Sequence, residues 1–203
     1  MEEAVPFASR AYGILLAVLF VSRGMDFLST WVATPRLVLE GNPIAKKLGW
    51  KWGIPINVLL CGGFAMWPLP AIVISTTSLL VAARNFQSAW LMRSMGEHAY
   101  RDWYVDRVQQ TPITLYLSCL AGNTLLFAGI GIALIVSAVG ERTLHIIPFG
   151  IGLGLIAYAG AVVLFTMLSV WRLRRADSRR FGRSASRRDA VQEICPPVSG
   201  DIE

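Results

Sequence analysis

Apolar residues fall into five stretches along the chain, separated by segments that are polar, charged or rich in proline. The stretches cover residues 11–34, 53–67, 71–92, 113–139 and 146–170. All but the second reach the roughly 20 residues with which a helix crosses a hydrocarbon core about 30 Å thick. Because proline cannot continue a helix, Pro68 and Pro70 predict a tight hairpin between the second and third stretches. The pattern predicts an all-α integral membrane bundle of five transmembrane helices.

Lysine and arginine gather beside alternate ends of these stretches, in the loop Pro35–Trp52, in the linker Arg93–Thr111 and after Trp171. Such residues mark the cytoplasmic side of a membrane, so we expect the N-terminus outside and the C-terminus in the cytoplasm. The linker mixes both charge signs with aromatic residues, which predicts an amphipathic helix resting on the membrane. Residues 1–171 then form the five-helix transmembrane domain, and residues 172–203 form a basic, disordered cytoplasmic tail.

Composition supports the assignment to a membrane and limits the partners, metals and cofactors that we expect. With 54% hydrophobic and 16% charged residues, the chain is too apolar for an ordinary soluble domain. Most of the excess positive charge lies in the run Arg172–Arg188, next to the last apolar stretch, which predicts attraction to anionic lipid headgroups and no nucleic-acid partner. The three cysteines form no ligand pattern, and neither His98 nor His145 has a second histidine at helical spacing. We therefore predict no metal site and no cofactor.

Charged and amide side chains inside the apolar stretches are the candidate site. A charge at the centre of a spanning helix costs at least about 2.5 kcal/mol, so such residues usually pair or perform a function. Asp26 and Arg84 lie at similar depths, about 12 to 14 Å from the cytoplasmic ends of their helices, which predicts that they pair. The remaining arginine, Arg23, would suit an anionic or carbonyl-rich ligand. The whole candidate layer comprises Arg23, Asp26, Thr30, Asn57, Arg84, Asn85, Gln87 and Asn123, together with Glu40 and Asn42 from the loop.

Structural explanations of the same residues stay open. Buried polar groups also hold helices together, with about 0.6 kcal/mol per interhelical hydrogen bond, so the layer could serve packing alone. The spacing of Gly150 and Gly154 predicts a close-packing surface, used either between the fourth and fifth stretches or against a second copy of the chain.

The first third of the chain contains an aspartate, a Ser/Thr-Thr pair and a Glu-x-Asn-Pro motif, formed by Asp26, Ser29, Thr30, Glu40, Asn42 and Pro43. In these residues it resembles a family of small multi-pass prokaryotic membrane proteins of unknown function. It implies a multi-pass fold and a bacterial cytoplasmic (inner) membrane, and it implies no activity.

These observations favour a protein without catalytic residues, whose polar pocket lies in the cytoplasmic half of the membrane and binds a lipid headgroup, a small polar ligand or a partner's helix. Membrane lipids are the expected partners, and other membrane subunits or a second copy are further candidates, with an accessory role in a larger complex as one form of the hypothesis. A transporter that uses Asp26 as its proton- or ion-coordinating group is the first alternative. An intramembrane lipid-processing enzyme with Asp26 or Glu40 as general base is the second.

Overall fold

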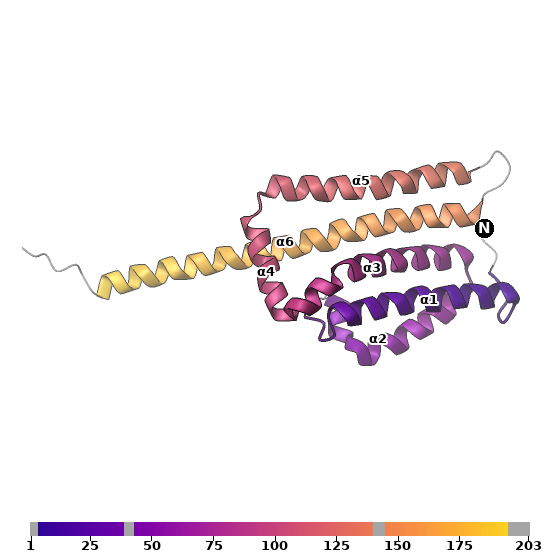
Figure 1. Cartoon of the computed structure of the whole chain (residues 1–203), viewed down its shortest axis with the longest axis horizontal. Coiled ribbons are helices and arrows are strands. Elements are labelled where there is room, and N and C mark those ends of the chain that lie inside the picture. Colours follow the sequence, from indigo (N-terminus) through magenta and orange to yellow (C-terminus); the bar gives the residue numbers. More distant parts are fainter. Residues whose placement is uncertain (1–3, 39–42, 140–144, 195–203) are drawn as a thin grey trace, which may run out of the picture. The chain divides into compact units, whose positions relative to one another are not determined.

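The computed structural model describes residues 4–38, 43–139 and 145–194, with the backbone alone at 43–45 and 173–194. These residues form six helices and no strand (Figure 1). The helices are α1 (Arg10–Ala33), α2 (Pro43–Phe64), α3 (Pro68–Met95), α4 (Glu97–Gln110), α5 (Ile113–Ala138) and α6 (Ile146–Ile194). The predicted all-α class is confirmed for the described part of the chain.

Four of these helices are long and apolar enough to cross a membrane, namely Arg10–Ala33, Pro68–Met95, Ile113–Ala138 and the Ile146–Arg172 part of α6. Their bounds lie within a few residues of the predicted first, third, fourth and fifth stretches. The chain is therefore a helical membrane protein.

The second predicted stretch belongs to α2, which is kinked at Gly49. Gly49 has φ 61° and ψ −169°, a backbone conformation that side chains disfavour and glycine adopts freely. The part after the kink, residues 50–64, contains Pro55 and is about 22 Å long, shorter than a hydrocarbon core; it is called the straight part below because its backbone is helical throughout. Pro68 does not form the turn but begins α3, because the first residues of a helix need no backbone N–H donor.

Helices α1 and α3 pack extensively against each other along a seam whose α3 positions are small residues and one asparagine. Arg23 bonds to Ser78 and Thr30 bonds to Asn85, both with a sequence separation of 55, so the two helices run parallel and in register. The seam positions recur at alternating spacings of three and four residues, as in a heptad repeat. They are Tyr12, Leu15, Leu19, Ser22, Asp26, Ser29 and Ala33 on α1, and Ala71, Ser75, Ser78, Ala82, Asn85 and Ala89 on α3.

Glycines bring α6 close to both α3 and α5. A Cβ added at Gly150 would lie 2.8 Å from Ile72, and one added at Gly154 would lie 2.7 Å from Thr76, both on α3. Gly152 meets α5 instead, because its Cβ would lie 2.6 Å from the carbonyl oxygen of Gly131. A close-packing role for these glycines is confirmed, but the Gly150 and Gly154 pair faces the third predicted stretch, where the fourth was expected.

A short helix, α4, connects α3 to α5, so the helix predicted for the linker is confirmed, but its apolar and polar residues are not separated onto opposite faces (Figure 1). Gly96, with φ 80°, separates α3 from α4. The first compact unit of the chain ends at Phe165 and the second begins at Thr166. Within α6 the helix continues as far as Ile194, so the basic segment predicted to be disordered is helical over residues 172–194. Residues 195–203 of that predicted tail lie outside the described residues.

Candidate functional site

The Arg23 guanidinium is the centre of a hydrogen-bond network that joins α1, α2 and α3. Its Nη1 donates to Asp26 Oδ2 at 2.7 Å and to Ser78 Oγ at 3.1 Å. Its Nε donates to Asn57 Oδ1 at 2.9 Å, and Nη2 donates to the same oxygen. Arg23 therefore binds its own helix, the straight part of α2 and the middle of α3.

Neighbouring groups hold this network in place. The Asn57 amide nitrogen donates to the carbonyl oxygen of Gly53 at 2.8 Å, which orients the amide oxygen toward Arg23. The ring of Phe27 lies 5.6 Å from the guanidinium carbon, within the range of a cation–π contact. The oriented Asn57 amide and the Phe27 ring together restrict the movement of the Arg23 side chain.

A second polar contact lies two helical turns nearer the end of α1. Asn85 Nδ2 donates to Thr30 Oγ1 at 3.2 Å and to Ser29 Oγ at 3.3 Å. Ser29 in turn donates to the backbone oxygen of Asp26 at 2.8 Å. These bonds place the polar side chains of the α1–α3 seam directly beside the Arg23 network.

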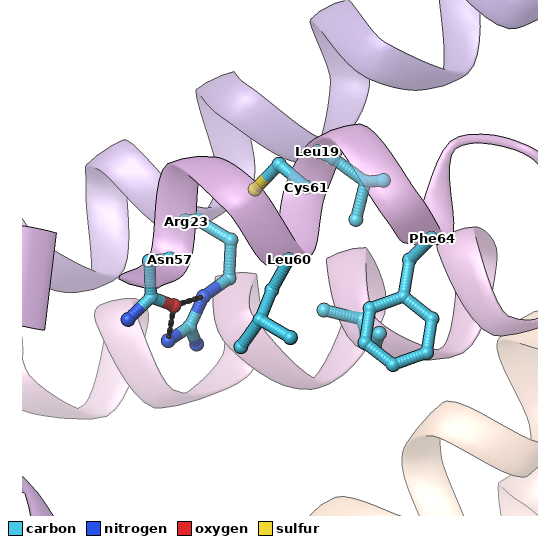
Figure 2. Close-up of a pocket in the computed structure, with 7 residues that line it drawn as sticks. Leu19, Arg23, Asn57, Leu60, Cys61 and Phe64 are labelled. Carbon is cyan, nitrogen blue, oxygen red and sulfur yellow. Dashed lines mark hydrogen bonds between the residues drawn. The ribbon is translucent and has the colours of Figure 1, made fainter. Parts of the chain in front are cut away.

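A cavity of about 110 Å³ opens beside Arg23, between α1, α2 and α3. Figure 2 shows the Arg23 guanidinium and the Asn57 amide at one end, and the apolar side chains of Leu60 and Phe64 further along. The complete lining is Leu19, Arg23, Asn57, Leu60, Cys61, Phe64 and Ile74. The cavity is thus a small apolar space with hydrogen-bonding groups at one side only.

One N–H of Arg23 is left over at this site. A guanidinium carries five N–H donors, and Nε, Nη1 and Nη2 together use four of them on Asp26, Asn57 and Ser78. The fifth, on Nη2, has no acceptor among the residues that the structure describes. The Arg23 side chain retains 27% exposure, so a ligand in the cavity can reach it.

The predicted pairing of Asp26 with Arg84 is wrong for the described residues, because the ion pair formed is Arg23–Asp26. The Arg84 and Gln87 side chains on α3 are exposed and lie off the seam, and Asn123 on α5 is also exposed. The structure brings together Arg23, Asp26, Thr30, Asn57 and Asn85. The other two predicted residues, Glu40 and Asn42, lie outside the described residues.

The predicted layer did not include Ser78, a residue expected from the sequence to bond to helix carbonyls, although it accepts a hydrogen bond from Arg23. A polar serine in an apolar stretch is unremarkable by hydropathy. The signal that identifies it is the recurrence of small residues on α3 at spacings of three and four, which marks a close helix contact.

Glu97, at the start of α4, forms a second polar cluster that sequence reasoning also overlooked. Its carboxylate accepts hydrogen bonds from Thr34 Oγ1 at 2.8 Å, the Arg36 backbone N–H at 3.0 Å and the Val38 backbone N–H at 3.2 Å. Burial alone would raise the pKa of Glu97, but these bonds and the nearby Arg36 charge outweigh it and lower the pKa. The cluster ties the chain after α1 to the corner between α3 and α4.

No three histidine, cysteine, aspartate or glutamate side chains come together as metal ligands within residues 4–38, 46–139 and 145–172. In this part of the chain the polar chemistry is that of hydrogen bonding and ion pairing. Comparisons of the chain with protein-family models, with curated proteins and with solved structures give no match.

Proposed function

We propose that this protein is a non-enzymatic, multi-pass protein of the bacterial cytoplasmic membrane that binds an apolar molecule carrying a carbonyl group. The carbonyl oxygen accepts a hydrogen bond from Arg23, and the apolar body occupies the cavity beside Leu60 and Phe64. Membrane lipids and other lipophilic molecules dissolved in the bilayer are the proposed ligand class.

The observation that carries the proposal is an Nη2–H of Arg23 that has no acceptor among the described residues and lies beside an apolar cavity. A donor in such a place is stabilised by an acceptor, because leaving it without one costs roughly 1 to 3 kcal/mol. The cavity of about 110 Å³ is close to the size of an engineered apolar cavity that binds benzene, roughly 150 Å³. A small ring or the carbonyl-bearing part of a chain therefore fits it.

Charge favours a neutral acceptor over an anion. Asp26 lies 2.7 Å from Arg23 and already neutralises the guanidinium. A second carboxylate would leave the site with net negative charge in a medium of low dielectric, which is costly. An ester or ketone oxygen takes the hydrogen bond without that cost.

Depth points to a ligand dissolved in the bilayer. Arg23 is ten residues from the Ala33 end of α1, about 15 Å at 1.5 Å per residue, which is near the middle of a hydrocarbon core about 30 Å thick. A charged headgroup would have to leave the interface to reach it. Leu60, which lines the cavity, is 48% exposed on the surface of the described structure, so a ligand dissolved in the bilayer has a short path into the cavity.

The proposal includes five membrane passes, with the N-terminus outside and the C-terminus in the cytoplasm. The straight part of α2 supplies the fifth pass, and a bilayer accommodates such a short span by local thinning. The basic residues of the loop after α1, of α4 and of the end of α6 then share the cytoplasmic side, in agreement with the positive-inside rule.

The test fills the cavity without touching the polar network. Leu60→Trp places a large ring at the cavity wall, whereas Leu59→Trp adds the same ring to the neighbouring residue, which is 76% exposed and does not line the cavity. Binding of a long-chain methyl ketone and of its matched alkane is measured on the purified full chain by native mass spectrometry.

We expect the wild type and Leu59→Trp to bind the ketone in preference to the alkane, and Leu60→Trp to lose most of that binding. A lowered C=O stretching frequency in the infrared spectrum reports the hydrogen bond to Arg23. Equal binding of ketone and alkane, or unchanged binding by Leu60→Trp, would refute the proposed site.

A further inference from the structure

A second pocket, separate from the Arg23 cavity, lies against α4. Its volume is about 290 Å³. Its lining comes from α4, the last turns of α3, the residue after α4 and the first turn of α5: Leu91, Tyr100, Trp103, Tyr104, Arg107, Val108, Thr111 and Tyr116. The lining combines four aromatic rings with one arginine, a composition unlike that of the Arg23 cavity.

The aromatic rings form one connected group. The Tyr100 ring lies 5.7 Å from Trp103 and is stacked at 6.3 Å on Tyr104, measured between ring centroids. The hydroxyl oxygens of Tyr104 and Tyr116 are 3.3 Å apart. Only one of these two hydroxyls donates to the other, so a second hydroxyl hydrogen is available for an acceptor in the pocket.

The charged donors of the pocket come from arginine. Arg107 uses Nη1 on Gln110 Oε1 at 3.3 Å, which leaves most of its five N–H groups for other acceptors. The adjacent carboxylate of Asp106 accepts from Gln110 Nε2 at 2.8 Å.

The position of the pocket identifies the type of ligand. α3 ends at Met95 and α5 begins at Ile113, and both helices are candidate membrane spans, so α4 lies where the spans leave the hydrocarbon. Tyrosine and tryptophan are enriched at this depth, where lipid headgroups lie. A ligand in this pocket meets phenol and guanidinium donors at headgroup level.

We propose that this pocket binds the phosphodiester of an anionic lipid headgroup. The Arg107 guanidinium matches the paired oxygens of a phosphate, and a tyrosine hydroxyl donates to a third oxygen. The aromatic rings pack against the glycerol and the first carbons of the chains. The volume suits a phosphate with a small polar substituent, since ligand pockets begin near 300 Å³.

The test compares two arginines of the same helix. Arg107→Gln removes the pocket's guanidinium, and Arg101→Gln removes the same charge from an exposed position of α4 that does not line the pocket. The full chain in neutral detergent is titrated with dioleoylphosphatidylglycerol and, separately, with dioleoylglycerol, and bound lipid is counted by native mass spectrometry. Inorganic phosphate is added in excess as the competitor.

We expect Arg107→Gln to weaken phosphatidylglycerol binding about tenfold, Arg101→Gln to change it less than twofold, and phosphate not to displace the lipid. Equal losses in the two variants would show general charge attraction and would overturn the site. Equal binding of dioleoylglycerol would overturn the role of the phosphate, and displacement by inorganic phosphate would overturn the lipid as the ligand. Should Arg107→Gln fail to fold, the double variant Tyr104→Phe and Tyr116→Phe, which removes both hydroxyls, must weaken binding measurably for the proposal to stand.

Discussion

Replacing Gly152 by alanine introduces a methyl group at a close contact between α5 and α6. The new Cβ would lie 2.6 Å from the backbone oxygen of Gly131 and 2.8 Å from the side chain of Ile135. Contacts under 3.0 Å are essentially never seen for real Cβ atoms. Because the first obstacle is a backbone carbonyl, no side-chain rotation relieves it, and the two helices must move apart.

The expected loss of stability follows from two opposing contributions. Overpacking of a close contact costs about 1 to 3 kcal/mol, and we take the upper end because backbone must move. Alanine is a better helix former than glycine by about 1 kcal/mol, which opposes the loss. The net expectation for Gly152→Ala is a decrease of about 2 kcal/mol in the free energy of unfolding.

The chain offers matched controls on the same two helices. A Cβ at Gly129 on α5 or at Gly160 on α6 meets nothing within 4 Å in the described structure. We expect Gly129→Ala and Gly160→Ala to be neutral or up to about 1 kcal/mol more stable. The assay is reversible unfolding of the purified chain in mixed micelles. If Gly152→Ala proved as stable as Gly160→Ala, the close approach of α5 and α6 would be wrong.

Three further predictions concern the polar clusters. Asp26→Asn should lower the free energy of unfolding by about 3 kcal/mol, because it leaves the positive charge of Arg23 without its counter-ion. Double-mutant cycles measured by unfolding should show coupling of Asp26 to Arg23 and none to Arg84. Ser75→Ala should be neutral or stabilising, because Ser75 Oγ is buried without a partner among the described residues, whereas Ser78→Ala, measured in the same way, should cost about 1 kcal/mol. Because the pKa of Glu97 is lowered in the folded state, its carboxylate contributes its full stabilisation above the ordinary pKa of 4.5. This stabilisation is lost as the pH falls through the lower pKa of the folded state. Thermal unfolding should therefore show a decrease in melting temperature at acid pH in the wild type that is absent from Glu97→Gln.

Hydropathy and helix length were enough to locate four of the helices. Long apolar stretches have no low-energy alternative to helix in a membrane, because each backbone N–H and C=O must be satisfied within the segment. The kink of α2 was not predictable in this way. A glycine can either continue a helix or interrupt it, and the sequence does not distinguish these two cases. At Gly49 the positive φ in the structure shows that the helix is interrupted.

The choice of partner for Asp26 shows what depth alone leaves open. Asp26 and Arg84 lie at similar depths, but two groups meet only if they also share a direction around their helices. On α3 the seam passes through Ala82 and Asn85, and Arg84 lies between them on the exposed side. Arg23 lies three residues before Asp26 on the same helix, and this spacing by itself puts the two side chains on one face. The heptad spacing of small residues contains this directional information.

The same seam explains why an arginine can be held near the middle of α1. Beside Arg23 the seam is formed by Ser22 on α1 and by Ser78 and Ala82 on α3, and these small residues leave no volume for an arginine side chain between the two helices. Arg23 follows the seam residue Ser22, so its guanidinium lies at the edge of the contact, where Asn57 of α2 and Ser78 of α3 both reach it. Since α2 packs on α1 far less extensively than α3 does, space remains beside Arg23. A close two-helix contact with a loosely packed third helix therefore produces both the fixed charge and the cavity that the proposed ligand would occupy.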